Sequence, residues 1–378
     1  MTRINIRKNP VISSGPNCGA DFLVENWRHK ISANVGFDTA SFDIKEDQSL
    51  LEDFFFSGIT RQVTRYSDDG QTVIWDGYIA EMTLTEPGLS SRISAREMFN
   101  KVAVRYTPID TSANPPTESA ETVTAFVNDD DSQNSYGIKE RIFTPPNLDK
   151  LTNADATQLS NTILQQYRQP KRSSNFSSGA DTPRITCTCE GYFKTLDWRI
   201  YNQSVSSGTA NANTIIQTAA SSVGQYIAGF NLDTNTTAVQ QYFNDSLTAM
   251  TIVQQIAALG DGSYNRWIVN VLEDRYLSYK QAASTISYWR RMADPRQEIF
   301  DAQGRSIPYH EIRPDRWLRT TDIMPMSVTP TKLVDDLQAM YIESVDYAEP
   351  DSLNLNGILG DRLQIMIARA ANRGDALL

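Results

Sequence analysis

Alternating apolar and polar positions dominate the first hundred residues and predict short β-strands. Ala40, Phe42 and Ile44 alternate with polar neighbours, which is the two-residue period of a half-buried strand. The segment 67–70 (Ser-Asp-Asp-Gly) contains the Asp-Gly pair typical of a hairpin turn. The same reasoning predicts further strands at 58–66, 72–75, 77–82 and 90–95.

Two features are expected to close this first β-rich unit. The pair Asp76-Gly77 interrupts a strand pattern and predicts a bulge or a sharp bend, as small barrels need at their corners. A short helix through Met98, Phe99 and Val102 is expected to end the unit.

The chain changes character at residue 109. Pro115-Pro116 and Pro145-Pro146 bracket an acidic stretch rich in Ser and Thr, which predicts a loop or an extended arm. We expect the segment from Pro115 to Pro146 to project from the barrel and to become ordered on assembly, because its polar composition gives it little to bury alone. A helix is predicted from Thr152, with Asp155 three residues later as in a capping box, to Pro170.

The segment 183–201 resembles part of the first unit. At a constant offset of 94 residues, the segment 189–199 aligns with 95–105, and Phe193 and Arg199 match Phe99 and Arg105. This similarity favours two related barrel-like units. The alternative is a chance similarity between two strand-to-helix turns.

The remaining chain predicts an α+β region followed by short strands. Apolar spacing indicates helices near 215–227 and 250–259, and the segments 267–271 and 276–279 form a predicted hairpin. A terminal helix is expected from Asn356 to Arg373. The predicted fold is mainly β with α+β insertions, namely two related small β-barrel units plus a helix-and-hairpin domain. The predicted division is 1–108 (first barrel), 109–172 (acidic arm and connecting helix), 173–209 (second barrel-like unit, with strands returning from the C-terminal third), 210–285 (α+β domain) and 286–378 (C-terminal strands and helix).

Composition excludes several classes of protein. The 378 residues carry a net charge of −10, which argues against a sequence-independent nucleic-acid binder or a polybasic membrane-surface protein. No apolar stretch is long enough to predict a membrane span, and the first ten residues lack the apolar run of a signal peptide. We therefore expect folding in a cytoplasm. Three cysteines exclude a disulfide scaffold, and two histidines leave little material for triads or zinc sites.

For each motif that could bind a metal or a phosphate, a purely structural role is the favoured interpretation. The run from Asp129 to Glu140 faintly resembles a calcium loop, but Asn134 stands where the turn needs Gly, so a solvated acidic turn is expected. Cys187 and Cys189 are expected to be two buried small hydrophobes on one strand face rather than half a metal site. The segment 260–262 (Gly-Asp-Gly) lacks the following Lys-Ser/Thr pair of a phosphate loop and predicts a helix stop.

Aromatic and basic clusters suggest contacts with other molecules. Four aromatic residues could form a sugar-binding platform, although cross-strand pairing is the favoured interpretation: Tyr264, Trp267, Tyr276 and Tyr279. Several arginines form basic islands that would suit an acidic protein partner: Arg290, Arg291, Arg313, Arg316 and Arg319. The sequence thus predicts no catalytic, cofactor-binding or metal-ligating residue, and no enzyme activity.

Three segments in order resemble the baseplate hub, or tail-hub, proteins of tailed bacteriophages. They are Val73–Ile79 followed by Ile93–Glu97, then Ser135–Glu140, which is similar to a YG-x-[RK]-E stretch, and then Trp267–Tyr279. The resemblance covers about 37–279. It implies a structural virion protein of the tail tip or baseplate, assembled in the host cytoplasm as a homotrimeric hub ring around the DNA channel. In the family, two related barrels per chain let a trimer imitate a six-fold ring.

The resemblance also implies partners. These are other copies of the chain, a tail tube or distal tail protein, a tip or fibre protein and a tape-measure protein, with no sequence-specific nucleic acid. Two alternatives remain open at the sequence level: a tail-associated glycan hydrolase driven by paired carboxylates, and an adhesin that binds host-surface carbohydrate through the aromatic hairpin.

Overall fold

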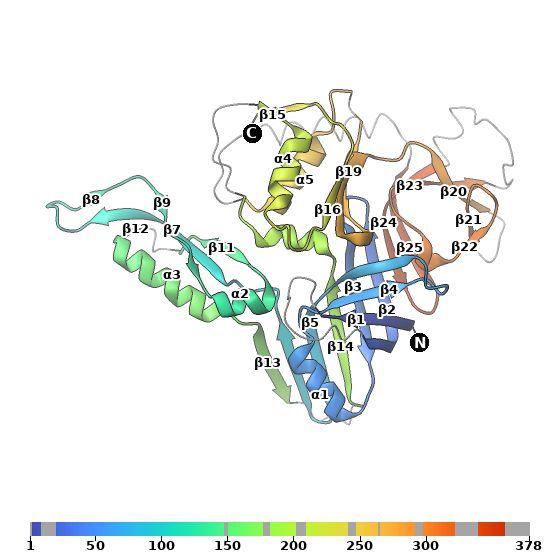
Figure 1. The fold of residues 1–378 in the computed structure, drawn as a ribbon, viewed down its shortest axis with the longest axis horizontal. Coiled ribbons are helices and arrows are strands. Elements are labelled where there is room, and N and C mark those ends of the chain that lie inside the picture. The colour runs from blue at the N-terminus through green and yellow to red at the C-terminus, as the bar shows by residue number, and fades with distance from the viewer. Residues whose placement is uncertain are drawn as a thin grey trace.

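The computed structural model describes residues 2–8, 20–146, 150–176, 182–201, 209–240, 247–263, 265–291, 298–321 and 339–359. The fold is mainly β with a few helices (Figure 1), as the sequence predicts. No helix among these residues is long and apolar enough to cross a membrane.

Six antiparallel strands form a closed barrel. Around the barrel they follow in the order β1 (Thr2–Arg7), β2 (Ala20–Ser32), β3 (Gly36–Ile44), β14 (Arg184–Glu190), β5 (Val73–Glu86) and β4 (Gln62–Tyr66), which pairs back with β1. Ala40, Phe42 and Ile44 are buried in its core, as their alternation predicts, and they pack with Trp27 and Trp75. Burial of these aromatic and aliphatic side chains is the main stabilising contribution.

The hairpin and the following strand are confirmed. Ser67–Gly70 forms the turn between β4 and β5, and β6 (Leu89–Ser94) pairs with β5. Helix α1 (Gln48–Ser57) was not predicted, because its apolar residues are crowded into a run of three phenylalanines. It closes one end of the barrel by burying Leu51 and Phe55.

The segment 183–201 does not begin a second barrel, so this part of the prediction is wrong. Strand β14 pairs with β3 and β5 and closes the first barrel, because Ile185, Cys187 and Cys189 point into its core. After the barrel, the two segments compared at offset 94 diverge. The first continues into a strand, β7 (Lys101–Asp110), and the second into a 3-10 helix, η1 (Tyr192–Trp198).

The acidic arm is a small α/β unit rather than a loop. No helix forms at Met98, Phe99 and Val102, because the first two lie in the irregular segment before β7 and Val102 lies in β7. Strand β7 is the centre of a sheet whose other strands are β8 (Thr117–Glu118), β9 (Thr122–Val123), β10 (Val127–Asn128), β11 (Glu140–Phe143) and β12 (Lys150–Leu151). Two helices belong to it, α2 (Asp130–Tyr136) and α3 (Asn153–Tyr167). Thr152 caps α3 as predicted. Figure 1 shows the unit projecting from the barrel.

The α+β region follows the predicted helices and hairpin. Its elements are β15 (Thr209–Asn211), α4 (Ala212–Ser221), β16 (Gly229–Leu232), β17 (Ala238–Gln240), α5 (Ala249–Leu259), β18 (Trp267–Val271), η2 (Glu273–Arg275) and β19 (Tyr276–Gln281). Helices α4 and α5 pack with the hairpin around a shared core.

Strands from the C-terminal third form a second curled sheet. They are β20 (Ile286–Arg291), β21 (Ile299–Phe300), β22 (Ser306–Ile307), β23 (Arg316–Thr321), β24 (Ala339–Ala348) and β25 (Ser352–Leu359), with the 3-10 helix η3 (Tyr309–Glu311) after β22. The terminal helix predicted from Asn356 is wrong over 356–359, where β25 pairs with β24. The rest of that helix, 360–373, lies outside the described residues. Apart from the second barrel-like unit, the bounds in the five-part division of the chain remain a prediction.

Both histidines of the chain lie at the seam between the barrel and the second sheet. There β2 pairs with β24, with His29 opposite Tyr347. The ring of Tyr347 lies 5.2 Å from that of His29 and 5.9 Å from that of His310, and the guanidinium of Arg65 covers Tyr347. Burial, and then the charge of Arg65, hold the pKa of His29 well below its usual range. Both histidines therefore serve the packing of this seam.

The buried carboxylate of Asp76 predicts a measurable dependence of stability on pH. Burial raises its pKa to about 6, although Gln62 and Thr64 donate hydrogen bonds to its carboxylate. Because the folded pKa exceeds the usual 3.8, the wild-type protein loses stability as the pH rises from about 4 to 6. Asp76→Asn removes this loss. We expect its stability relative to wild type to rise by about 2–3 kcal/mol between pH 4 and pH 7, measured by urea unfolding at each pH. A difference that does not change with pH would contradict the burial of this charge.

Candidate functional site

The segment that carries the YG-x-[RK]-E resemblance lies where the arm meets the barrel and the α+β region. Helix α2 ends at Tyr136, and the next residue, Gly137, has a φ of 80° that suits glycine. A Cβ atom there would lie 2.2 Å from the hydroxyl of Tyr226, beside α4. The buried Asn100 amide donates to the Gly137 carbonyl (2.7 Å) and accepts from the Lys139 N–H (2.8 Å). The backbone of this segment is therefore fixed between three units.

Lys139 connects the arm to the exit of the barrel. Its Nζ donates to the carbonyl of Ala95, just after β6, over 2.7 Å. The same ammonium lies 4.2 Å from the ring centroid of Trp198 in η1. Burial lowers the pKa of Lys139 to about 8, and the negative charge of Glu190 opposes that shift. The lysine holds a barrel strand, the arm and η1 together.

Glu140 makes a second connection, from the arm to the chain that follows η1. This residue is 7% exposed. Its carboxylate pairs with Lys101 of β7 at 2.8 Å and with Arg199 at 3.6 Å. Its second oxygen accepts from the Ile200 N–H at 2.9 Å. A buried carboxylate with these donors is a rigid joint, because removing either cationic partner would leave its charge poorly compensated.

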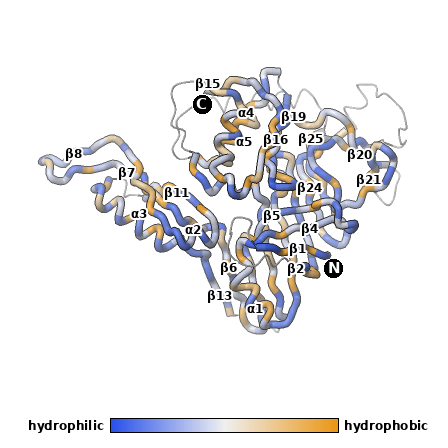
Figure 2. The backbone as a smooth tube through the Cα atoms, in the orientation of Figure 1, coloured by the Kyte–Doolittle hydropathy of each residue, from blue (hydrophilic) through white to orange (hydrophobic). Residues whose placement is uncertain are grey.

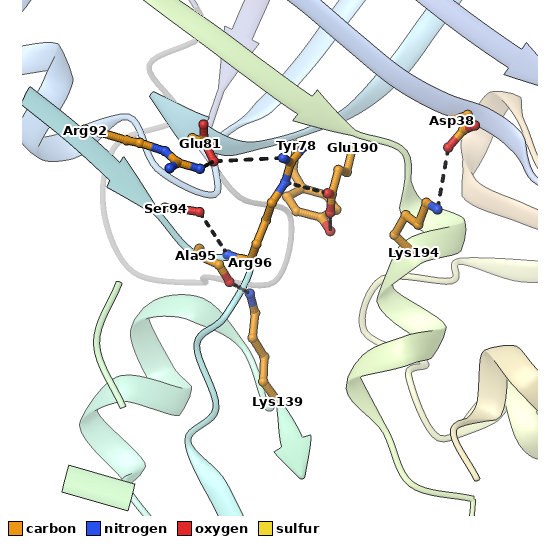
Figure 3. Close-up of polar contacts among 10 residues, drawn as sticks. All are labelled: Asp38, Tyr78, Glu81, Arg92, Ser94, Ala95, Arg96, Lys139, Glu190 and Lys194. Atoms are coloured by element: carbon orange, nitrogen blue, oxygen red, sulfur yellow. Dashed lines mark hydrogen bonds and ion pairs between the residues drawn. The ribbon is translucent and has the colours of Figure 1, made fainter. Parts of the chain in front are cut away.

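The barrel contributes a rim of paired charges to the same junction (Figure 3). Glu190 at the end of β14 accepts hydrogen bonds from Arg96 and from the Tyr78 hydroxyl, both at 2.9 Å. Burial, and then the charge of Glu190, raise the pKa of Tyr78 well above its usual range. Arg92 donates to Glu81 at 2.6 Å on the neighbouring strands. The rim thus orders the chain where it leaves the barrel for the arm.

Aromatic rings fill the space behind these charges. Trp198 contacts Tyr78 (5.3 Å between centroids) and Tyr226 (5.0 Å), both edge-on. Tyr192 lies 6.0 Å from Tyr78 and 6.3 Å from Tyr226. These residues come from β5, η1 and the segment after α4, so the junction has one continuous core. Of these aromatic residues, only Tyr78 lies in a segment that the sequence resemblance singles out, Val73–Ile79.

The motifs considered for chemistry have structural roles. Asp129 caps α2 by accepting from the Ser132 N–H, and it pairs with Arg168. Cys187 and Cys189 are fully buried side by side in the barrel, where burial raises the pKa of both thiols. Burial raises the pKa of Asp261, but hydrogen bonds from Trp267 and Asn265 outweigh burial and lower this pKa to about 2. In the described part of the chain, no three His, Cys, Asp or Glu side chains gather as metal ligands.

The aromatic hairpin does not display a sugar-binding platform. Trp267 and Tyr279 are buried in the α+β core, with their rings 4.7 Å apart. Tyr276 is 47% exposed, and Tyr264 lies outside the described residues. Arg313 also departs from expectation, because its guanidinium is largely buried and donates to the carbonyls of Val73 and Ile74. It joins η3 to the barrel rather than forming part of a basic surface.

No protein-family model and no curated protein matches this chain. Among solved structures, it is similar to the 43 kDa tail protein of prophage MuSo2 from Shewanella oneidensis, with 7% identity and a TM-score of 0.44 over 97% of this chain and 98% of that one. It is also similar to a tail protein from Neisseria meningitidis MC58, with 7% identity and a TM-score of 0.45 over 94% and 95% of the two chains.

A third similar structure is the E. coli c3393 protein, described as a component of the type VI secretion system with structural similarity to the T4 tail proteins gp27 and gp5. The identity is 8% and the TM-score 0.41, over 90% of this chain and 74% of that one. The first two of these structures are phage tail proteins, and the third is a type VI secretion component.

Proposed function

We propose that this chain is a structural component of a phage tail tip or baseplate, a hub ring that joins the tail tube to tip or fibre proteins around the DNA channel. The observation that supports this most is the junction at Tyr136–Glu140. This stretch belongs to Ser135–Glu140, one of three segments that resemble hub proteins, and it locks the closed barrel, the projecting arm and the α+β region into one body. A part that transmits load between neighbouring proteins needs such a rigid joint.

The proposed ring is a homotrimer. The duplication at offset 94 does not support this number, because the two segments adopt different structures. The support comes from the resemblance, together with two β units per chain: the closed barrel and the second curled sheet. Three chains would offer six such units, which suits contact with a six-fold tube. A net charge of −10 would also limit DNA sticking during passage, because like charges repel.

The proposed role is structural and not catalytic. The buried ionisable groups described above are engaged in packing: Lys139 and Glu140 in the junction, Asp76 in the barrel and His29 at the seam. The proposed partners are the tail tube or distal tail protein, a tip or fibre protein and the tape-measure protein. Purified chain is expected to release no dye from labelled peptidoglycan. Cleavage abolished by a single carboxylate substitution would contradict the structural role and support the hydrolase.

Deletion of the gene in the phage or prophage that encodes the chain tests the assignment. If the chain joins the tail tube to the tip, tails should fail to assemble without it, and lysates of the deletion should contain filled heads without attached tails in negative-stain images. Supply of the intact gene from a plasmid should restore tailed particles. Normal tails in the deletion would contradict the proposal. Complete tails that fail only to adsorb would favour the adhesin instead.

A further inference from the structure

One strand at the base of the barrel has an unpaired edge. In the described part of the chain, β13 (Lys171–Phe176) pairs only with β6, and all six of its residues are exposed. Figure 2 shows that most of them are hydrophilic. The exception is Phe176, which is 88% exposed. An edge strand offers free backbone N–H and C=O groups to another chain, and an exposed Phe beside it offers apolar area to bury.

The register shows which residues of β13 lie on the same face of the sheet as the core residues of β6. Arg172 lies opposite Ile93 in β6, and Phe176 lies opposite Leu89. Ile93 is buried in the barrel core, and residues directly opposite each other share a face of the sheet. Phe176 and Arg172 are therefore on the inner face, where Arg172 covers the ring of Phe56. A strand added beside β13 would extend this face and cover the exposed ring of Phe176.

A complementary edge exists on the second sheet. Within the described ranges β25 pairs only with β24, and an open groove of about 980 Å³ is lined by residues of β25 together with residues of β20 to β24 and η3. Apolar side chains contribute much of its lining: Ile299, Ile307, Leu318, Met340, Leu353 and Leu355. Glu298 and Asp351 bring negative charge to the lining, and Arg290 brings positive charge.

We propose that β13 of one copy pairs with the edge of β25 in a second copy and inserts Phe176 into this groove. Arg172 of β13 brings a positive charge that matches the net negative groove, whereas Lys171 is paired with Glu97 in its own chain. Figure 1 places β13 and β25 on different sides of the barrel, so the contact joins two copies rather than closing within one. Such a head-to-tail contact forms a ring when its rotation closes. The inference deepens the proposed function and rests on it.

The test compares two exposed aromatic residues in the full-length chain. Phe176→Asp should weaken self-association at least ten-fold in sedimentation velocity, whereas Tyr276→Asp, on the α+β hairpin, should assemble like wild type. Circular dichroism confirms that both variants fold. In the wild type, backbone amides of β13 and β25 should gain hydrogen-exchange protection on assembly, and in Phe176→Asp they should not. Equal assembly of the two variants would overturn the proposal. So would assembly of the wild type without a gain of hydrogen-exchange protection in the amides of β25.

A charge exchange gives an independent measurement. Arg172→Glu should weaken assembly, and a second substitution, Asp351→Lys, should restore part of it. Normal assembly of Arg172→Glu, or no recovery in the double variant, would overturn the pairing. The proposed function can fail separately. If the wild-type chain forms rings through other surfaces, only the strand pairing is wrong, whereas a deletion phage with normal tails contradicts the hub assignment.

Discussion

Replacing Lys139 with alanine is expected to loosen the arm from the barrel and to lower the free energy of unfolding by about 2–3 kcal/mol. The substitution leaves the Ala95 carbonyl without its donor, which costs about 1–3 kcal/mol in a buried site. It also removes the cation over the Trp198 ring. Relief from burying a charge offsets part of this loss. Limited proteolysis should cut the arm of the variant much faster than that of the wild type.

Lys150→Ala is the matched control, because this lysine of the same arm is exposed and pairs with the exposed Glu118. Its effect should stay within about 0.5–1 kcal/mol. The pH dependence adds a second readout. Since the folded pKa of Lys139 is about 8 and the usual value is 10.5, its contribution makes the protein more stable as the pH rises between these values. That rise should be smaller in Lys139→Ala than in Lys150→Ala. Equal proteolysis and equal pH profiles would show that Lys139 does not hold the junction.

Gly191→Ala is expected to have the larger effect and to prevent stable folding. Gly191 lies between β14 and η1, and its N–H donates to the Asp38 carbonyl of β3 at 2.9 Å. A Cβ atom there would lie 1.7 Å from the Phe37 carbonyl oxygen. Backbone atoms of a barrel strand have no room to move, so we expect a loss of about 3 kcal/mol or more.

Gly262→Ala is the control, since a Cβ atom at that position meets nothing within 4 Å. Its unfolding midpoint in urea should stay close to the wild-type value. A Gly191→Ala protein with the wild-type midpoint would mean that β14 does not enter η1 through this close contact with β3.

The sequence predicted the local elements well where the apolar period was regular. Alternation at Ala40, Phe42 and Ile44 predicted a barrel strand, and the Thr152 cap predicted the start of α3. The sequence pattern was less informative where the place of a strand depends on which other strands pair with it. The strand Arg184–Glu190 has the alternation of any half-buried strand, and only its pairing with β3 and β5 shows that it belongs to the first barrel.

The junction could be predicted only in part, for a similar reason. The segment Tyr136–Glu140 stood out by its resemblance, but nothing in its pattern shows that Lys139 reaches the carbonyl of Ala95, 44 residues away. The contacts of Trp198 and Tyr226 likewise depend on tertiary packing. A buried lysine and a buried glutamate side by side look like a solvated pair in sequence, because charge alone does not reveal burial.

An image of the intact particle tests the hub assignment most directly. A small tag inserted in the exposed turn after Gly70 would mark the chain without touching the junction. Cryo-electron microscopy of tagged particles should show the added density on a ring of three chains at the tail tip, with the DNA channel through its centre. Density on the head, along the tube or on lateral fibres, or six copies in the ring, would contradict the account.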